Sequence, residues 1–288
     1  MSIKSRKRTA TARATGAAER SGVNGLRRRW PRIHRTDCEP WPQVALIERW
    51  AQHHPEFRAW LASQQGAPAL VRGLLEAWQT FHDGEFSRAI ALAQHLGPPG
   101  AVIANKAAAV DTLYSERAPA QILKSLEQAI ERGERAVATL EDYANAHYTL
   151  ALVLGRYSQR ISILTALAEG LGGRIRAHLE RALALEPRHA EAHLALGLYH
   201  AEIVAKLGPL TASLAYGASR AAGLEHFEHA VKLAPASPIV LMEFAHGLLL
   251  LDGSHRERAL ELYRQAAACE PADAMEGLDV ARARRGLQ

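Results

Sequence analysis

The chain has 288 residues, of which 48% are apolar, so it can bury one large core or two ordinary ones, and a fully disordered chain is excluded. The formal net charge of +5 is unevenly distributed: residues 1–36 contain 11 Lys or Arg and one Glu. The other 252 residues contain 24 basic and 29 acidic residues, a net charge of −5. We therefore predict a disordered basic tail over residues 1–40 and a folded domain over residues 41–288.

The cysteines and the apolar segments indicate the compartment. Cys38 and Cys269 are too few for a disulfide framework and fit a reducing environment. The longest apolar stretch, residues 239–251, contains an acidic residue and is too short to span a bilayer. No apolar segment follows the basic N-terminus as it does in a secretory signal, so we expect a cytoplasmic protein. The tail also resembles an Arg-rich transit peptide, which leaves import into an organelle as an alternative.

The predicted elements are helices throughout. Residues 41–62 place Leu46, Trp50 and Trp60 on one helical stripe, which Pro55 interrupts or from which it starts a second helix. After residue 65, Gly and Pro recur at the intervals that separate helices, and no segment alternates apolar and polar residues as a half-buried strand does. The predicted fold class is all-α.

A repeat is visible in the C-terminal half, where similar helices end at Pro187, Pro235 and Pro271. Ahead of each proline stands a large residue followed three positions later by alanine: Leu179 and Ala182, Phe227 and Ala230, Tyr263 and Ala266. Other helices carry a large residue, then Leu or Phe followed by a small residue: His147-x2-Leu150-Ala151, His193-x2-Leu196-Gly197, Leu241-x2-Phe244-Ala245.

These residues resemble the tetratricopeptide (TPR) pattern, in which small residues let paired helices approach and large ones fill the space between pairs. The resemblance covers roughly residues 68–285 and is most specific from about residue 140. It implies a right-handed solenoid of antiparallel helix pairs. Weaker units precede the clear repeats, at Gly84-x-Phe86-x2-Ala89 and Ile122-x3-Leu126-x2-Ala129.

Two of the repeats are longer than usual. Pro187 and Pro235 are 48 positions apart, against a standard TPR period of 34. Leu164-Thr165-Ala166 recurs 46 positions later as Leu210-Thr211-Ala212, so two consecutive units share the elongated form. Within the TPR superfamily, these long units resemble the T component of tripartite periplasmic transporters and the regulator-of-microtubule-dynamics group. Both are helical adaptors, and the resemblance implies a protein that is not an enzyme and has no cofactor.

The TPR resemblance also implies a binding groove, because the first helix of each pair lines the concave face. The leading hypothesis is a protein-protein adaptor that binds a peptide or helix there. Chaperone adaptors clamp a C-terminal carboxylate with Lys and Asn at such positions, but here they hold Tyr148, Leu194 and Met242, which suits an amphipathic helix or an apolar ligand better. Packing of these side chains against a neighbouring helix is the alternative. The candidate groove residues are Asn145, Tyr148, Leu152, Arg156, Glu191, Leu194, Leu198, Glu202, Ile239, Met242 and His246.

Two other binding modes stay open. An enclosed apolar cavity in the elongated units 144–235, lined by Tyr148, Leu194 and Tyr216, would favour a small-molecule-binding protein of the transporter-associated type. The tail of residues 1–36 could bind nucleic acid or an anionic membrane surface, but its only aromatic residue, Trp30, offers no stacking platform.

Candidate chemistry is sparse. The glycine-rich segment before residue 176 opens a helix, and Gly172, Gly173, Arg174 and Arg176 could bind an anion, although no nucleotide-binding fingerprint is present. His189 and His193 have the i, i+4 spacing of zinc ligands, but no third ligand is specified, so we predict no metal site. No Gly-x-Ser-x-Gly nucleophile motif occurs.

Overall fold

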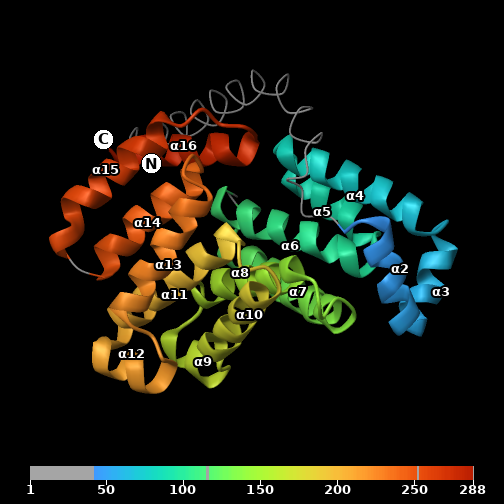
Figure 1. Cartoon of the computed structure of the whole chain (residues 1–288), viewed down its shortest axis with the longest axis horizontal. Helices are drawn as coiled ribbons and strands as arrows, with labels where there is room; N and C mark the ends of the chain where they lie inside the picture. The colour runs from blue at the N-terminus through green and yellow to red at the C-terminus, as the bar shows by residue number, and fades with distance from the viewer. Residues whose placement is uncertain (1–41, 115–116, 252, 288) are drawn as a thin grey trace, which may run out of the picture.

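The computed structural model describes residues 42–114, 117–251 and 253–287, and the basic tail predicted for residues 1–40 lies outside these ranges. Within them the chain is all-α, which confirms the predicted fold class (Figure 1). The helices are α2 (Val44–His53), α3 (Pro55–Ser63), α4 (Ala67–His82), α5 (Phe86–Gln94), α6 (Gly97–Tyr114), α7 (Pro119–Thr139), α8 (Ala144–Ser158), α9 (Ile163–Ala168), α10 (Leu171–Leu185), α11 (Ala190–Leu207), α12 (Pro209–Tyr216), α13 (Arg220–Leu233), α14 (Pro238–Leu251), the short 3₁₀ turn η2 (Gly253–His255), α15 (Arg256–Ala268) and α16 (Ala274–Gly286).

The helices pack in consecutive pairs. α4 packs against α5, α6 against α7, α8 against α10, α11 against α13 and α14 against α15. The short helices α9 and α12 are inserted between the members of the third and fourth pairs, so they are the extra length that the 48-residue spacing predicted. In Figure 1, α9 and α12 lie along the same edge of the molecule, at the bottom of the view.

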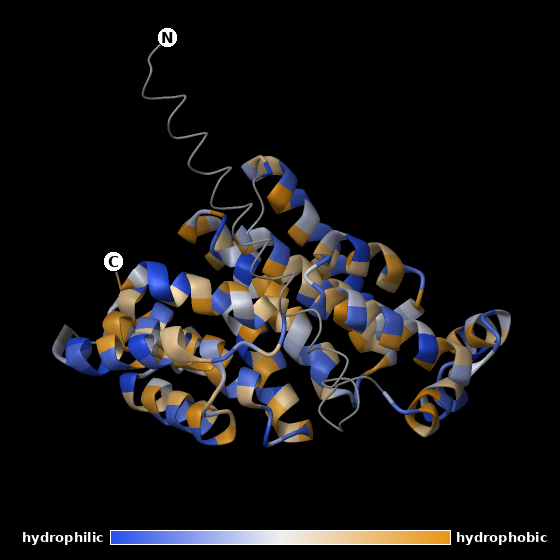
Figure 2. Ribbon diagram, turned by 90° about the horizontal axis from the view of Figure 1, so that it is seen from above, coloured by the Kyte–Doolittle hydropathy of each residue, from blue (hydrophilic) through white to orange (hydrophobic). Residues whose placement is uncertain are grey.

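Helix boundaries follow local sequence signals. Pro55 begins α3, where its missing N–H leaves no hydrogen bond unmade. Ser162, Ser219 and Asp273 cap α9, α13 and α16, because each side chain accepts a hydrogen bond from a backbone N–H three residues later. Blue and orange segments alternate along most helices, as expected when each buries a single apolar stripe (Figure 2).

Small residues set the distance between helix pairs, as the TPR pattern predicts. Phe227 of α13 is fully buried and stacks on Phe244 of α14, with ring centroids 5.0 Å apart. Gly197 of α11 and Gly247 of α14 face the Phe227 ring so closely that an added Cβ would lie 2.6 and 2.2 Å from it. The glycines are therefore the positions that let α11 and α14 approach around one aromatic ring.

The solenoid closes on itself at its inner face. Helix α16 packs against α14 and α15 and also reaches the N-terminal helices (Figure 1). At that meeting point the Asp273 carboxylate pairs with the His82 imidazole, and the Tyr114 hydroxyl donates to Asp279 Oδ1 over 3.2 Å. Side chains of α4 and α6 therefore meet the start and the middle of α16.

Candidate binding pocket

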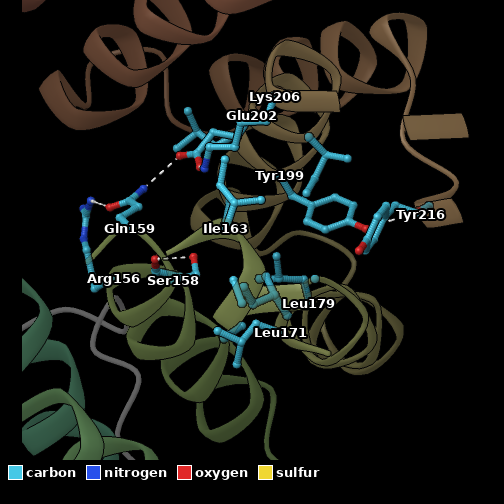
Figure 3. Close-up of a pocket in the computed structure, with 18 of the residues that line it drawn as sticks. Arg156, Ser158, Gln159, Ile163, Leu171, Leu179, Tyr199, Glu202, Lys206 and Tyr216 are labelled. Atoms are coloured by element: carbon cyan, nitrogen blue, oxygen red, sulfur yellow. Dashed lines mark hydrogen bonds and ion pairs between the residues drawn. The ribbon is translucent and has the colours of Figure 1, made fainter. Parts of the chain in front are cut away.

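A pocket of about 160 Å³, partly open to solvent, lies inside the two elongated repeats. Helices α8, α9, α10 and α11 form its walls, and Tyr216 from the end of α12 closes one side (Figure 3). Most of the wall is apolar. The apolar lining residues are Ala151, Leu152, Ile163, Ala166, Leu167, Leu171, Ile175, Leu179, Ala195, Leu198, Ile203 and Leu207.

One edge of the pocket is polar, and its side chains are joined by hydrogen bonds (Figure 3). Arg156 Nη1 donates to Gln159 Oε1 over 3.3 Å, and Gln159 Nε2 donates to Glu202 Oε1 over 2.8 Å. The other carboxylate oxygen of Glu202 accepts from Lys206 Nζ over 2.8 Å. This polar edge links the C-terminal halves of α8 and α11, and Arg156 Nε has no hydrogen-bond partner within the described residues.

The opposite end is held by contacts to Tyr216. Its carbonyl oxygen accepts hydrogen bonds from the Tyr199 hydroxyl over 3.1 Å and from Arg176 Nη1 over 3.0 Å. Gly172 lies under the Tyr216 ring, where an added Cβ would be 2.9 Å from it. Burial of the Tyr199 hydroxyl raises the pKa of Tyr199 to about 12, although the charge of Arg176 opposes this rise. The Tyr199 hydroxyl therefore stays a donor at neutral pH.

The two inserted helices expose apolar side chains beside the pocket. Of the eight large apolar side chains that are exposed in the described part of the chain, five lie on α9 and α12: Ile163, Leu164, Leu167, Leu210 and Leu214. Leu164 and Leu214 are 78% and 81% exposed. Because Ile163 and Leu167 also line the pocket, the apolar surface continues from α9 into it.

The predicted groove residues divide into three groups. Leu152, Arg156, Leu198 and Glu202 line the pocket. Tyr148, Leu194 and Met242 are only 6%, 5% and 2% exposed, so these three belong to the core, as the packing alternative states. Asn145, Glu191, Ile239 and His246 are partly exposed but do not line the pocket. Their role in binding stays a prediction.

Glu191 instead takes part in a partly buried ion pair. Lys106 Nζ of α6 lies 3.1 and 3.2 Å from its two carboxylate oxygens and 5.7 Å from the centre of the Trp78 ring. Burial alone would raise the pKa of Glu191, but Lys106 together with His189 and Tyr148 lowers it below the ordinary value. The pair therefore stays ionised at neutral pH and joins α6 to α11.

The glycine-rich segment predicted to bind an anion forms the start of α10. Arg174 pairs with Glu134, and Arg176 donates to Glu180 Oε1 over 2.7 Å as well as to α12. Gly172 lines the pocket, and Gly173 is exposed. Anion binding at this segment stays a prediction.

Two histidine pairs occupy equivalent places in the elongated repeats. His147 and His178 face each other through their Nδ1 atoms at 3.1 Å, and His193 and His226 do so at 3.0 Å. Nε2 of His147 lies 3.1 Å from the Glu141 carbonyl oxygen and therefore donates to it, so its Nδ1 accepts from His178. Within the described residues, no group of three or more His, Cys, Asp or Glu side chains could hold a metal ion.

The sequence offered one signal for the lining residues that the groove prediction missed. Ile163, Leu167, Gln159 and Lys206 follow no TPR position, because α9 and the ends of α8 and α11 lie outside the repeat pattern. The recurrence of Leu164 as Leu210 indicated that the inserted segments are related, but it did not indicate where they lie relative to the repeats. In the described ranges, no helix combines the length and the apolar character needed to cross a bilayer.

Comparison with a solved structure supports the TPR-like fold. TTC0263, a thermophilic TPR protein from Thermus thermophilus, aligns over 75% of this chain and 99% of its own, with 18% identity and a TM-score of 0.55. The MamA protein aligns over 68% of this chain and 89% of its own, with 14% identity and a TM-score of 0.39. No curated protein sequence matches the chain significantly. The sequence profile described as "Regulator of microtubule dynamics protein 1-3" matches residues 102–284, which includes every wall of the pocket. The chain therefore belongs to the regulator of microtubule dynamics protein 1-3 family.

Proposed function

We propose that the chain is a non-enzymatic adaptor that binds an amphipathic helix of a partner protein at the pocket of the elongated repeats. TPR-like folds typically serve as scaffolds for protein interactions. The observation that carries the proposal is the apolar pocket whose wall continues onto the exposed side chains of α9. The proposed site thus uses the predicted groove residues Leu152, Arg156, Leu198 and Glu202.

The size of the pocket favours anchoring side chains over a whole ligand. An apolar cavity of about 150 Å³ holds one molecule the size of benzene, whereas pockets for drug-sized molecules span about 300–1,000 Å³. At about 160 Å³, this pocket has room for one or two apolar side chains. A helix that inserts such anchors would rest its remaining apolar face on α9 and α12.

The polar edge would determine the orientation of the bound helix. Arg156, Gln159, Glu202 and Lys206 present both charge signs in a row along one side of the pocket. An amphipathic helix with apolar anchors and a mixed charged flank would match both the wall and this edge. Charged pairs at such an edge affect the association rate and specificity more than the affinity.

A pocket-filling substitution tests the proposal. Gly155 of α8 lines the pocket, and an added Cβ there would meet nothing within 4 Å. Gly155→Leu therefore adds an apolar side chain at the pocket wall, where its Cβ has open space, and it favours the helix by somewhat less than the roughly 0.8–1 kcal/mol that separates Gly from Ala. Gly173→Leu is the matched control, because Gly173 also has open space around its Cβ position but is exposed outside the pocket.

Peptides displayed as amphipathic helices would be selected on the wild-type chain and then titrated against both variants. We expect Gly155→Leu to weaken binding at least tenfold and Gly173→Leu to leave it unchanged, with both proteins folded by circular dichroism. Leu214→Glu, at a side chain that is 81% exposed, should weaken binding as well without affecting stability. Peptides that bind Gly155→Leu as tightly as the wild type would contradict the pocket assignment.

A second candidate is a small apolar molecule held in the same pocket, because the wall is mostly apolar and Tyr216 closes one end. Native mass spectrometry of the purified chain distinguishes the two candidates. A molecule that accompanies the wild type and Gly173→Leu but is absent from Gly155→Leu would establish the second candidate over the first.

The family name suggests one class of partner. Because the family is described as regulators of microtubule dynamics, microtubules are a partner to test for this chain. If the pocket contributes, the chain should co-sediment with assembled microtubules, and Gly155→Leu should reduce the bound fraction while Gly173→Leu does not.

A further inference from the structure

A second pocket, of about 190 Å³, lies between α5, α6 and α7, and it differs in chemistry from the apolar pocket of the elongated repeats. Its lining is mostly polar. Ser87 and Gln94 come from α5, Asp111 from α6, and Ser125, Gln128 and Arg132 from α7. Neutral hydrogen-bonding side chains on α5 and α7 therefore share one pocket with the guanidinium groups of Arg132 and Arg117, of which Arg117 is paired with Asp111.

Arg132 carries a partly buried charge that no acid of the described residues neutralises. Its Nε donates to Asn105 Oδ1 over 2.9 Å, and no carboxylate pairs with it among the residues that the structure describes. The nearby acids are engaged elsewhere: Glu131 pairs with Arg135, and Asp111 pairs with Arg117. Burial, together with the charge of Arg135, lowers the pKa of Arg132 to about 10, which is the effect expected of a cation without a counter-charge.

A buried cation is normally paired, because the loss of hydration is offset only by an opposite charge or strong hydrogen bonds. Guanidinium has five N–H donors in a planar fork, of which the bond to Asn105 uses only one. The fork fits two oxygens of a phosphate or carboxylate. The hydroxyl and amide side chains that line the same pocket from α5 and α7 favour a tetrahedral oxyanion, which has oxygens left to accept from them.

We propose that Arg132, with Ser125, Gln128 and the facing side chains of α5, binds a phosphate group, either free or as the end group of a small molecule. The neutral donors Ser87 and Gln94 hold the remaining oxygens, and Asp111 stays neutralised by Arg117. The site is independent of the peptide pocket, since the two share no residue.

Isothermal titration calorimetry on the full 288-residue chain tests this site. The probes are inorganic phosphate, glycerol 3-phosphate and acetate, each added at constant ionic strength set with NaCl. Arg132→Gln removes the fork. Gln128→Glu keeps the fork but places a carboxylate in the pocket from an exposed position, where it repels an added anion and pairs with Arg132. Arg135→Gln removes an exposed charge of the neighbouring helix turn and is the control.

We expect inorganic phosphate to bind to the wild type and to Arg135→Gln, with affinity at least tenfold lower for Arg132→Gln and Gln128→Glu. Tighter binding of glycerol 3-phosphate would identify the end group of a larger molecule, and equal or weaker binding would identify the free anion. The proposal is overturned if neither phosphate probe binds the wild type, if Gln128→Glu binds as the wild type does, or if acetate binds as tightly as phosphate. Should Arg132→Gln fail to fold by circular dichroism, Gln128→Glu carries the test.

Discussion

At the residue scale, the acid stability of the elongated repeats depends on the two histidine pairs. Burial, and then the neighbouring His147, lowers the pKa of His178 to about 4; burial, and then His193 and His200, lowers that of His226 to about 4. The two rings of each pair share a hydrogen bond between their Nδ1 atoms. The ring that accepts this hydrogen bond has to be neutral. Protonation of both partners would leave two cations about 3 Å apart.

A pH profile of stability tests this account. Because the folded-state pKa values lie below the ordinary 6.5, the unfolded chain binds protons first as the pH falls. The stability that the pairs confer is therefore complete above about pH 6.5 and is lost between there and pH 4. Urea unfolding at pH 7, 5.5 and 4.5 should show this loss, and the double variant His178→Gln, His226→Gln should flatten it. His53→Gln, a substitution at an exposed position, is the control and should lose stability over the same pH range as the wild type.

At the scale of elements, the inserted helix α12 is held by few contacts. Ala212 is its one buried residue, and its C-terminal end depends on the hydrogen bonds that Tyr199 and Arg176 donate to the Tyr216 carbonyl oxygen. Segments with so few buried groups open locally at a lower cost than the core does. Helix α12, like α9, which has no buried residue, is thus expected to open more readily than the longer helices of the pocket.

Tyr199→Phe isolates the α12 tether. The substitution removes one hydrogen bond, at a cost of about 1 kcal/mol, and leaves the ring in place. Amide hydrogen exchange in residues 209–216 should become several-fold faster, while exchange in the middle of α11 stays unchanged. Equal acceleration in both helices would mean that the hydroxyl stabilises the whole fold and does not specifically hold α12.

The sequence predicted the paired helices well because the TPR pattern is local. Positions for large residues, such as Phe227 and Leu179, and for small residues, such as Gly197 and Ala182, recur at fixed spacing. The pairing of the helices therefore follows from their order along the chain. The insertion was also visible, since Leu164 recurs as Leu210. A pocket in the elongated units 144–235 was the alternative hypothesis, and Tyr216 does line the pocket there, whereas Tyr148 and Leu194 do not. Its polar edge was not predicted, because that edge joins Gln159 to Glu202 across two repeats and no periodicity encodes the contact.

At the scale of the whole molecule, long-range contacts of α16 connect the C-terminal and N-terminal parts of the fold. The contacts of Asp273 with His82 and of Asp279 with Tyr114 join α16 to the N-terminal helices, 191 and 165 positions away in the sequence. Their formation depends on the accumulated curvature of the successive helix pairs, which no single repeat specifies. Sequence analysis therefore predicted the concave groove without its closure.

Asp279 makes the closure sensitive to pH. Burial, with a smaller contribution from the carboxylates of Glu243 and Asp273, raises its pKa from 3.8 to about 7, against the Tyr114 hydrogen bond and Arg282. With the folded-state pKa raised, the stability linked to Asp279 is complete below about pH 4, where its carboxyl group is neutral, and is lost as the pH rises through 7, because the ionised carboxylate stays buried.

Replacement of Asp279 by asparagine, which cannot ionise, should remove this loss. We expect Asp279→Asn to raise the free energy of unfolding at pH 8 by roughly 2–4 kcal/mol and to have little effect at pH 4. Chemical denaturation at the two values measures it, with the exposed Glu257→Gln as control. An equal effect at both values would show that ionisation of Asp279 is not the cause.

The most direct test of the central claim, that the pocket of the elongated repeats binds the partner, is a titration followed by NMR of isoleucine methyl groups. Ile163, Ile175 and Ile203 line the pocket, whereas Ile239 lies on α14 among the predicted groove residues outside it. Addition of a selected helical peptide should shift the three pocket methyl signals and leave that of Ile239 in place. A shift of the Ile239 signal with no change at the other three would contradict the account and assign binding to α14.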